Sequence, residues 1–275
     1  CKCMKYKKLA KMKDGRFKRA VGIPRELFEI LVEVLRPSYE EKHKLGGRKP
    51  NLNIEDTLLM TLTYYRDYPT FFKLGMMFGL DESNAHRWVK WSENKLKEAL
   101  SGVIDIRDLD ENSEQLVDVT ECAIQRPKVY DIQKEYYSGK KKKHTIKIQI
   151  IMNEKNKKIV SVCFDKGSVH DFKIFKNTTK ELPDTLKFLA DSGYQGILDY
   201  FKNSMTPKKK SKNNPLTDED KELNTLISSI RISVEHVNSQ LKIFRIFSER
   251  YRSRINTFYS RFLIICSFYN LCLDT

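Results

Sequence analysis

Three acidic residues are candidates for a shared site: Asp118, Asp191 and Glu235. Asp118 lies between Val117 and Val119 in a strand-like segment, and an ionised side chain among apolar neighbours is unfavourable unless it is used. Asp191 follows the apolar run "LKFLA" and opens the turn "DSGYQG". Side chains at such strand ends are well placed for sites. Glu235 lies in the amphipathic segment "RISVEHVNSQLK".

Carboxylates that converge define a specific chemistry. Three of them cannot stay ionised side by side without a cation, because each raises the pKa of the others. Two Mg²⁺ ions, which Mn²⁺ can replace, bind through such carboxylates and keep part of their water. A pair of ions about 4 Å apart activates a water or hydroxyl on one side of a phosphodiester and stabilises the leaving oxygen on the other. If Asp118, Asp191 and Glu235 meet, we expect metal-assisted phosphoryl transfer.

Each of these residues also has an ordinary structural interpretation. Asp118 can be a structural residue of its strand, and Asp191 can cap its turn. Glu235 shares a polar helical stripe with Arg231, Asn238 and Lys242, at offsets of −4, +3 and +7. From the residues alone, the favoured interpretation of Glu235 is a solvated glutamate paired with a neighbour on that stripe.

The elements that must position the acids follow from hydrophobic periodicity. Val and Ile enrichment predicts a strand at 114–127 and a hairpin from 144–153 and 159–167. A helix is expected at 170–182 and a buried strand from 186. Thr217 and Asp220 form an Asp variant of the capping box at the start of a long helix, which we expect to pass Lys242. With a last helix at 254–273, this order predicts an α/β fold, a mixed sheet with helices packed on it.

The preceding part of the chain is predicted to be all-helical. Residues 1–20 form a basic arm of low apolar content, expected to be a flexible tail. Pro24 opens a helix that Pro37 is expected to end, and Asn53 caps the next. The expected domains are 1–20, 21–105 and 113–275.

Residues 70–100 have the ingredients of a helix-turn-helix. They predict a short helix to Phe78, a turn at Gly79 and a longer helix from near Ser83. Two packed helices of a bundle are the equally open alternative. In the helix-turn-helix interpretation, the polar side of the second helix contacts DNA through Ser83, Asn84, Arg87 and Lys90.

The charge balance favours a polyanionic partner. The chain carries 51 Lys and Arg against 36 Asp and Glu, a formal net charge of +15. A membrane surface is disfavoured, because no apolar run approaches the roughly 18 residues that span a bilayer. Six cysteines without paired spacing indicate a reducing cytoplasm. Two lysine runs are predicted to contact the DNA backbone, with solvated loops as the alternative: Lys140, Lys141, Lys142, Lys143 and Lys208, Lys209, Lys210.

Six blocks in order resemble the DDE transposases of bacterial insertion sequences, the group related to Harbinger-type DDE endonucleases. They are "DVTE", "YYSGKKKKHTIKIQ", "GSVHDFKIFK", "LADSGYQG", "PKKKSKNNPLT" and the spacing Arg231-x3-Glu235-x6-Lys242. The resemblance runs from about residue 15 to about residue 270, nearly the whole chain. One departure is Ser228, where the related signature has a Tyr three residues before the Arg.

The resemblance implies an RNase H-like catalytic domain preceded by a helix-turn-helix. It implies that Asp118, Asp191 and Glu235 bind two Mg²⁺ ions. Arg231 and Lys242 are expected near the DNA. His170 either caps the helix that follows it or supports the site or contacts substrate. The expected activity is metal-dependent cleavage of element ends and transfer of the freed 3′ hydroxyl to target DNA. The expected partners are double-stranded DNA, through terminal inverted repeats and target, and further copies of the chain at the bacterial nucleoid.

Two other functions stay open at this point. The first is a catalytically silent or domesticated DNA-binding protein, which the Ser at position 228 keeps in consideration. The second is a structure-selective RNase H-like nuclease that acts without a preferred sequence.

Overall fold

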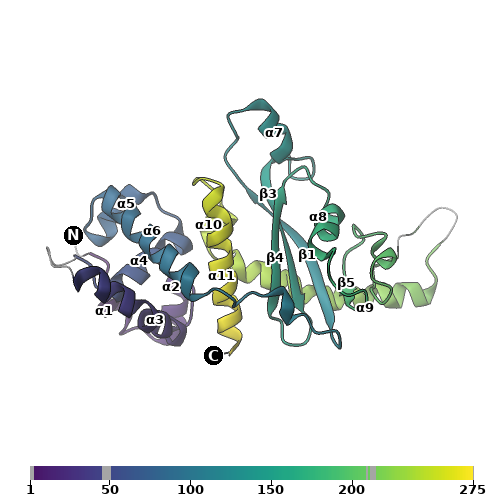
Figure 1. The fold of residues 1–275 in the computed structure, drawn as a ribbon, viewed down its shortest axis with the longest axis horizontal. Coiled ribbons are helices and arrows are strands. Elements are labelled where there is room, and N and C mark those ends of the chain that lie inside the picture. Colours follow the sequence, from purple (N-terminus) through teal and green to yellow (C-terminus); the bar gives the residue numbers. More distant parts are fainter. Residues whose placement is uncertain (1–2, 45–50, 209, 211–214, 275) are drawn as a thin grey trace. The chain divides into compact units, whose positions relative to one another are not determined.

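The computed structural model describes residues 3–44, 51–208, 210 and 215–274, and its chain forms two compact units (Figure 1). The helical unit comprises Cys1–Val103, Lys242–Ser248 and Arg254–Thr275. The sheet unit comprises Ile104–Leu241 and Glu249–Ser253. The C-terminal helix, which the expected domain limits place with the sheet, thus groups with the N-terminal helices.

The helical unit is built from amphipathic helices whose apolar faces form one core. Asn53 caps α4 as expected, because its side chain accepts a hydrogen bond from the backbone N–H of Asp56. The buried side chains of α3 include Leu27, Phe28 and Leu31. The helices are α1 (Tyr6–Leu9), α2 (Asp14–Val21), α3 (Arg25–Lys44), α4 (Ile54–Asp67), α5 (Phe71–Phe78), α6 (Glu82–Ala99), α10 (Arg245–Ser248) and α11 (Asn256–Asp274).

The expectation of a flexible basic arm was wrong for the residues described from Cys3 onward. They form α1 and α2, whose Leu9, Phe17 and Val21 are buried. The Tyr6 ring stacks on Phe28 with centroids 4.9 Å apart. A few apolar side chains at helical spacing are therefore enough to fold this segment onto the core, although lysines surround them.

Pro37 does not end its helix, contrary to expectation. Helix α3 continues to Lys44, with Pro37 inside it. Tyr39 holds the segment beyond the proline, since its hydroxyl donates to the Leu52 carbonyl at 2.5 Å and its ring stacks on Trp88. These tertiary contacts offset the hydrogen bond that proline removes.

The sheet unit has the mixed α/β architecture that the sequence predicts. Strand β3 pairs antiparallel with both β1 and β4, while β5 lies parallel beside β1. This is the mixed order expected of an RNase H-like sheet. Its elements are η1 (Ile106–Asp108), β1 (Glu114–Ala123), α7 (Tyr130–Tyr136), β2 (Tyr137–Ser138), β3 (Lys143–Asn153), β4 (Ile159–Lys166), α8 (Asp171–Thr179), β5 (Lys187–Leu189), η2 (Ile197–Asp199) and α9 (Asp218–Leu241).

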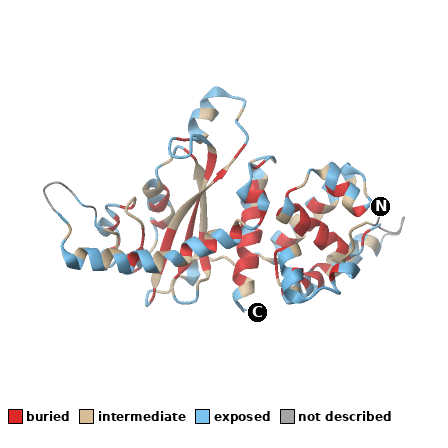
Figure 2. Ribbon diagram, turned by 180° about the vertical axis from the view of Figure 1, so that it is seen from behind, coloured by how far each residue is buried: buried red, intermediate tan, exposed pale blue. Residues whose placement is uncertain are grey.

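One hydrophobic cluster of this unit lies on the face of the sheet that α8 covers. Val117 and Ile151 pack there with Phe175 of α8 and with Phe188 and Tyr194. Alternation along β1 turns Asp118 toward the other face, and α9 packs against β1. Figure 2 shows the buried residues concentrated in the strands and along one side of α9.

Helix α9 begins as expected and ends slightly early. Thr217 Oγ1 accepts from the N–H of Asp220, and Asp220 Oδ2 accepts from the N–H of Thr217, so the capping box is formed. The helix ends at Leu241 rather than past Lys242. Leu241 is the last buried residue of its apolar stripe, and the chain turns there.

Candidate active site and nucleic-acid interface

Asp118 lies within β1, and Asp191 lies two residues beyond the end of β5, the parallel neighbour of β1. In the register of β1 and β5, Leu116 is the partner of Leu189. Asp118 and Asp191 each follow that pair by two residues. The parallel register therefore puts these two residues, which are far apart in the sequence, at corresponding levels along neighbouring segments of chain.

Asp191 adopts the geometry of a capped turn as well. Its Oδ1 accepts a hydrogen bond of 2.7 Å from the N–H of Gly193, and the side chain is half-buried. One carboxylate oxygen thus fixes the turn, and this contact orients the side chain at the strand end. The turn-capping interpretation and the site interpretation of Asp191 are compatible.

Helix α9 contributes a polar stripe beside Asp118. The amide Nδ2 of Asn238 donates to Asp118 Oδ2 at 2.9 Å, and the guanidinium of Arg231 lies 3.7 Å from Oδ1. Glu235 lies between these two residues on the helix and is exposed. The polar stripe of α9 therefore lies against Asp118. Glu235 belongs to the same stripe, so it is on the side of α9 that is turned toward Asp118.

Electrostatics links the three acids. Burial raises the pKa of Asp118 to about 6, and the positive charge of Arg231 opposes this rise. The negative charges of Asp191 and Glu235 raise the same pKa, whereas the Val119 N–H lowers it. Asp118 therefore senses the charges of both other carboxylates.

The carboxylates of Asp118, Asp191 and Glu235 are suitable ligands for divalent cations, provided that Asp118 gives up its present contacts. Carboxylate oxygens are what Mg²⁺ prefers, and excess negative charge at a half-buried site favours a cation. In the described part of the chain, no group of three or more His, Cys, Asp or Glu side chains is placed to hold a metal ion as it stands. Both oxygens of Asp118 already have partners, since Asn238 donates to one and Arg231 lies 3.7 Å from the other. A cation at Asp118 would compete with both contacts.

Two features near the acids escaped the sequence interpretation. The buried hydroxyl of Tyr194 has no hydrogen-bond partner among the described residues, and burial together with the charges of Asp118, Asp171 and Asp191 raises its pKa. The ammonium of Lys147 donates to Asp171 and to the Val169 carbonyl, both at 2.7 Å. A lysine alternating with isoleucines in "HTIKIQI" is the signal for the second feature, because its position on a largely buried strand requires a partner.

His170 is placed as a helix cap. Its Nδ1 accepts from the N–H of Phe172 at 3.3 Å, and the residue is exposed at the start of α8. This is the capping role that the sequence also allowed. The next residue, Asp171, carries the contact with Lys147.

In the helical unit, α5 and α6 form the expected helix, turn and helix. A Cβ at Gly75 would lie 2.5 Å from the Leu80 carbonyl oxygen, so the turn closes only around a glycine there. Ala85, Val89 and Leu96 of α6 are buried. The opposite side carries the predicted contact residues, of which three are exposed and Asn84 is half-buried: Ser83, Asn84, Arg87 and Lys90.

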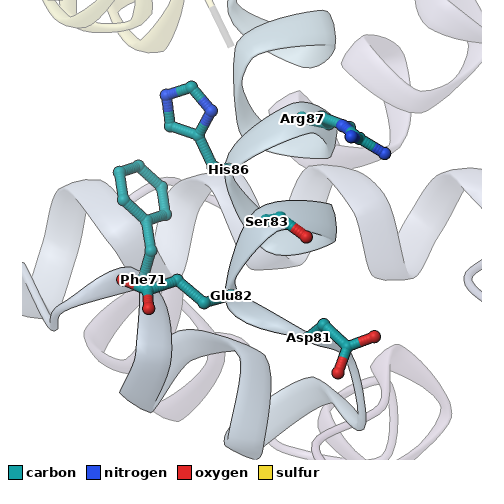
Figure 3. A pocket seen from close by; sticks show the side chains of 6 residues that line it. All are labelled: Phe71, Asp81, Glu82, Ser83, His86 and Arg87. Atoms are coloured by element: carbon teal, nitrogen blue, oxygen red, sulfur yellow. The ribbon is translucent and has the colours of Figure 1, made fainter.

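A cavity opens at the start of α6. Figure 3 shows side chains around this cavity of about 630 Å³, with Ser83 and Arg87 among them. Its lining residues are Phe71, Asp81, Glu82, Ser83, His86 and Arg87. Two of the four predicted contact residues thus line a hollow that also contains two acidic side chains.

A buried ion pair fixes the far end of α6. Arg261 of α11 donates to Glu93 through Nε at 2.6 Å and through Nη2 at 3.2 Å. The two side chains are only 5% and 12% exposed. Their partnership explains an arginine inside the apolar C-terminal segment, which the sequence interpretation passed over.

The predicted phosphate contacts fall into different environments. The first run, Lys140 to Lys143, is fully exposed around the β2–β3 turn and forms no ion pair within the described residues. Lys208 pairs with Asp220 at 2.5 Å, Lys210 is exposed, and Lys209 lies outside the described residues. Lys242 is half-buried just after α9.

Comparison with known proteins gives consistent matches. A family model described as DDE superfamily endonuclease matches residues 117–270, and one described as the helix-turn-helix of DDE superfamily endonuclease matches residues 50–102. The chain is 40% identical over 272 residues to a protein of Microchaete diplosiphon named "Probable transposase for insertion sequence element IS702", covering 97% of this chain and 98% of that protein.

A solved structure gives a weaker match. The crystal structure of a pre-cleavage Mos1 transpososome aligns with 83% of this chain and 80% of its own, at 12% identity and a TM-score of 0.22.

Within the described residues, no helix is both long enough and apolar enough to cross a bilayer.

Proposed function

The chain belongs to the DDE superfamily of endonucleases, and we propose from that membership that it is a DNA transposase of an insertion sequence. It cleaves the ends of the element and joins the freed 3′ hydroxyl to target DNA. The observation that supports the proposal is that Asp118 and Asp191 each follow the Leu116–Leu189 register pair by two residues, while the polar stripe of α9 contacts Asp118. The 40% identity to a probable transposase supports the same activity.

Asp118, Asp191 and Glu235 are the proposed ligands of two Mg²⁺ ions, with Mn²⁺ as a substitute. When bound, such ions supply charge stabilisation at the phosphate and a more acidic attacking water or hydroxyl. The chain's own contribution is orientation. The Gly193 N–H orients one oxygen of Asp191, and Asn238 and Arg231 orient the carboxylate of Asp118.

DNA is held in this proposal by two groups of side chains. The helix-turn-helix, which lies in the region 21–105 of the protein, reads the terminal inverted repeat. Ser83, Asn84 and Arg87 contact the bases, and Lys90 contacts the DNA backbone. Basic residues of the region 113–275 hold phosphates near the acids. They are Lys140, Lys141, Lys142, Lys143, Lys208, Lys209, Lys210, Arg231 and Lys242.

Transposition requires two element ends to be held together, which favours a homo-oligomer acting at the nucleoid. His170 is proposed to support the site through its position at the start of α8, next to the Asp171–Lys147 pair.

Plasmid nicking tests the proposed activity. Supercoiled plasmid with Mg²⁺ or Mn²⁺ is incubated with the wild type, with Asp118→Asn and with Glu121→Gln. Glu121 lies three residues further along β1 on the opposite face, where it accepts a hydrogen bond from Thr145 that Gln preserves. We expect nicking by the wild type and by Glu121→Gln, and none by Asp118→Asn.

Other outcomes identify the other functions. Equal nicking by the wild type and Asp118→Asn would show that the nicking comes from a contaminating nuclease, and the proposal that the chain is an enzyme would be rejected. Protection of an inverted repeat in a footprint, with no nicking, would indicate a silent DNA-binding protein. Nicking without any protected sequence would indicate a structure-selective nuclease.

A further inference from the structure

Between β1 and β3 the chain leaves the sheet and forms a projection, residues 125–144, called here the α7 lobe. It contains α7 and β2 (Figure 1). Most of its residues are exposed, as Figure 2 shows. The apolar side chains exposed there include Val129, Tyr130 and Tyr137, at 57%, 67% and 43%. The proposed cleavage chemistry uses none of these three side chains.

The α7 lobe contains a cavity of about 450 Å³, lined by Arg126, Gln133, Lys134, Tyr137 and His144. That volume falls in the range of about 300–1,000 Å³ that is usual for small-ligand sites. Tyr137 and His144 are direct register partners in β2 and β3. Their ring centroids lie 5.6 Å apart at an interplanar angle of 70°. Two rings at this angle present a stacking face and an adjoining wall.

Arg126 is held in place without being neutralised. Its Nε and Nη2 both donate to Gln133 Oε1, at 3.0 and 2.8 Å, and Gln133 Nε2 donates to the Pro127 carbonyl at 2.8 Å. The partner is an amide, and no carboxylate pairs with Arg126 in the part of the chain that the structure describes. The guanidinium is therefore oriented at the cavity and keeps its full charge.

The surroundings of the cavity are strongly positive. The α7 lobe has seven Lys and Arg residues and two acidic ones, Asp131 and Glu135. Glu135 pairs with Lys166 at 2.8 Å, and Asp131 lies 3.9 Å from Lys134, an exposed contact of little strength. This charge complements a polyanion and disfavours an apolar or basic protein surface.

We propose that this cavity binds an unstacked nucleobase of single-stranded DNA, with the base against Tyr137 and His144. Arg126 contacts the adjacent phosphate, and the exposed lysines of the β2–β3 turn follow the strand. Aromatic rings interleaved with cations recognise single strands in this way, because every base offers a face for stacking. The proposal rests on the proposed function, and gives it a site for a strand that leaves the duplex.

Binding of fluorescent oligonucleotides to the full chain tests the site. The probes are a 12-nucleotide single strand and a blunt duplex of the same sequence. We expect Tyr137→Ala to weaken single-strand binding about tenfold, roughly 1.4 kcal/mol, and to leave duplex binding within twofold. Tyr137→Phe, which keeps the ring, should bind like the wild type. Arg126→Gln should weaken single-strand binding and reduce its salt dependence.

The matched control is Tyr130→Ala. Tyr130 is a more exposed tyrosine of the same α7 lobe that does not line the cavity, so we expect no change. Equal losses from Tyr130→Ala and Tyr137→Ala would overturn the cavity as the site. Unchanged DNA binding accompanied by loss of self-association in Tyr137→Ala would assign the cavity to protein contact and also overturn the proposal. Wild-type nicking is measured in parallel, so failure of the cleavage function is seen separately from failure of strand binding.

Discussion

The guanidinium of Arg231 lies 3.7 Å from the Oδ1 of Asp118, across the packing of α9 on β1. Both side chains are largely buried, at 18% and 19% exposure. Within the part of the chain that the structure describes, the buried Nε of Arg231 and the buried Oδ1 of Asn238 have no hydrogen-bond partner. Arg231 thus partly balances a buried acid that is also close to two other acids, and its own hydrogen bonding is incomplete.

Replacing Arg231 should therefore change the titration of Asp118. Arg231 is the main group that lowers the pKa of Asp118 against burial and against the charges of Asp191 and Glu235. In Arg231→Gln, we expect the pKa of Asp118 to rise above its present value of about 6 in metal-free protein. NMR titration of the Asp118 carboxyl carbon measures this change, with Arg107→Gln as an exposed control. A lower pKa in Arg231→Gln would show that the arginine does not act on Asp118.

The raised pKa of Asp118 also predicts how stability depends on pH. The folded-state pKa of about 6 exceeds the ordinary 3.8, so between these values the folded state binds more protons than the unfolded state. The stabilisation that comes from protonated Asp118 is present below pH 4 and is lost as pH rises through 6. A shift of this size corresponds to about 2–3 kcal/mol in metal-free protein.

Asp118→Asn tests this directly, because an amide is neutral throughout. We expect the free energy of unfolding of Asp118→Asn, relative to the wild type, to rise by about 2–3 kcal/mol between pH 4 and pH 7. Urea unfolding at both pH values, in the presence of a chelator, measures it. Asp184→Asn, at an exposed position, should show no such difference. A pH-independent difference for Asp118→Asn would mean that the buried charge has no net cost.

Local patterns predicted most of the elements correctly, and tertiary contacts account for the rest. The Asn53 cap and the Thr217–Asp220 box are local, so their residue types were sufficient. The helix end predicted at Pro37 was wrong, because the contact between Tyr39 and Trp88 holds the part of α3 beyond the proline. That contact joins segments that are distant in the sequence. The same holds for Arg261, whose partner Glu93 is 168 residues away.

The candidate site was predictable in its acids and not in its contacts. Asp118 and Asp191 could be selected from the sequence, because Asp118 stands inside an apolar strand and Asp191 directly follows an apolar run. That Arg231 and Asn238 contact Asp118 depends on how α9 lies on the sheet, which no local pattern specifies. The α7 lobe was missed because its helix has only seven residues and no buried face.

Gly75 and Gly15 form a matched pair for testing the turn between α5 and α6. A Cβ at Gly75 would lie 2.5 Å from the Leu80 carbonyl, whereas a Cβ at Gly15 in α2 meets nothing within 4 Å. We expect Gly75→Ala to destabilise the protein by about 1–3 kcal/mol and to weaken binding to the inverted repeat. Gly15→Ala should stabilise it by about 0.5–1 kcal/mol. Thermal unfolding and DNA binding are the measurements, and normal DNA binding by a folded Gly75→Ala would argue against this turn as part of the DNA-reading element.

We expect the largest loss of stability from breaking the ion pair between Glu93 and Arg261. Removing one partner of a buried ion pair leaves an uncompensated charge, so Arg261→Ala should cost about 3–5 kcal/mol in unfolding free energy. Lys95→Ala breaks a more exposed pair with Glu98 on the same helix and should cost less than about 1 kcal/mol. The double change Glu93→Leu with Arg261→Met removes both charges and should recover most of the loss. Chemical denaturation of the four proteins measures these differences. If the double variant is as unstable as Arg261→Ala, the stability lies in the packing of Arg261, including its contact with the Tyr64 ring at 5.2 Å, and not in the charge pair.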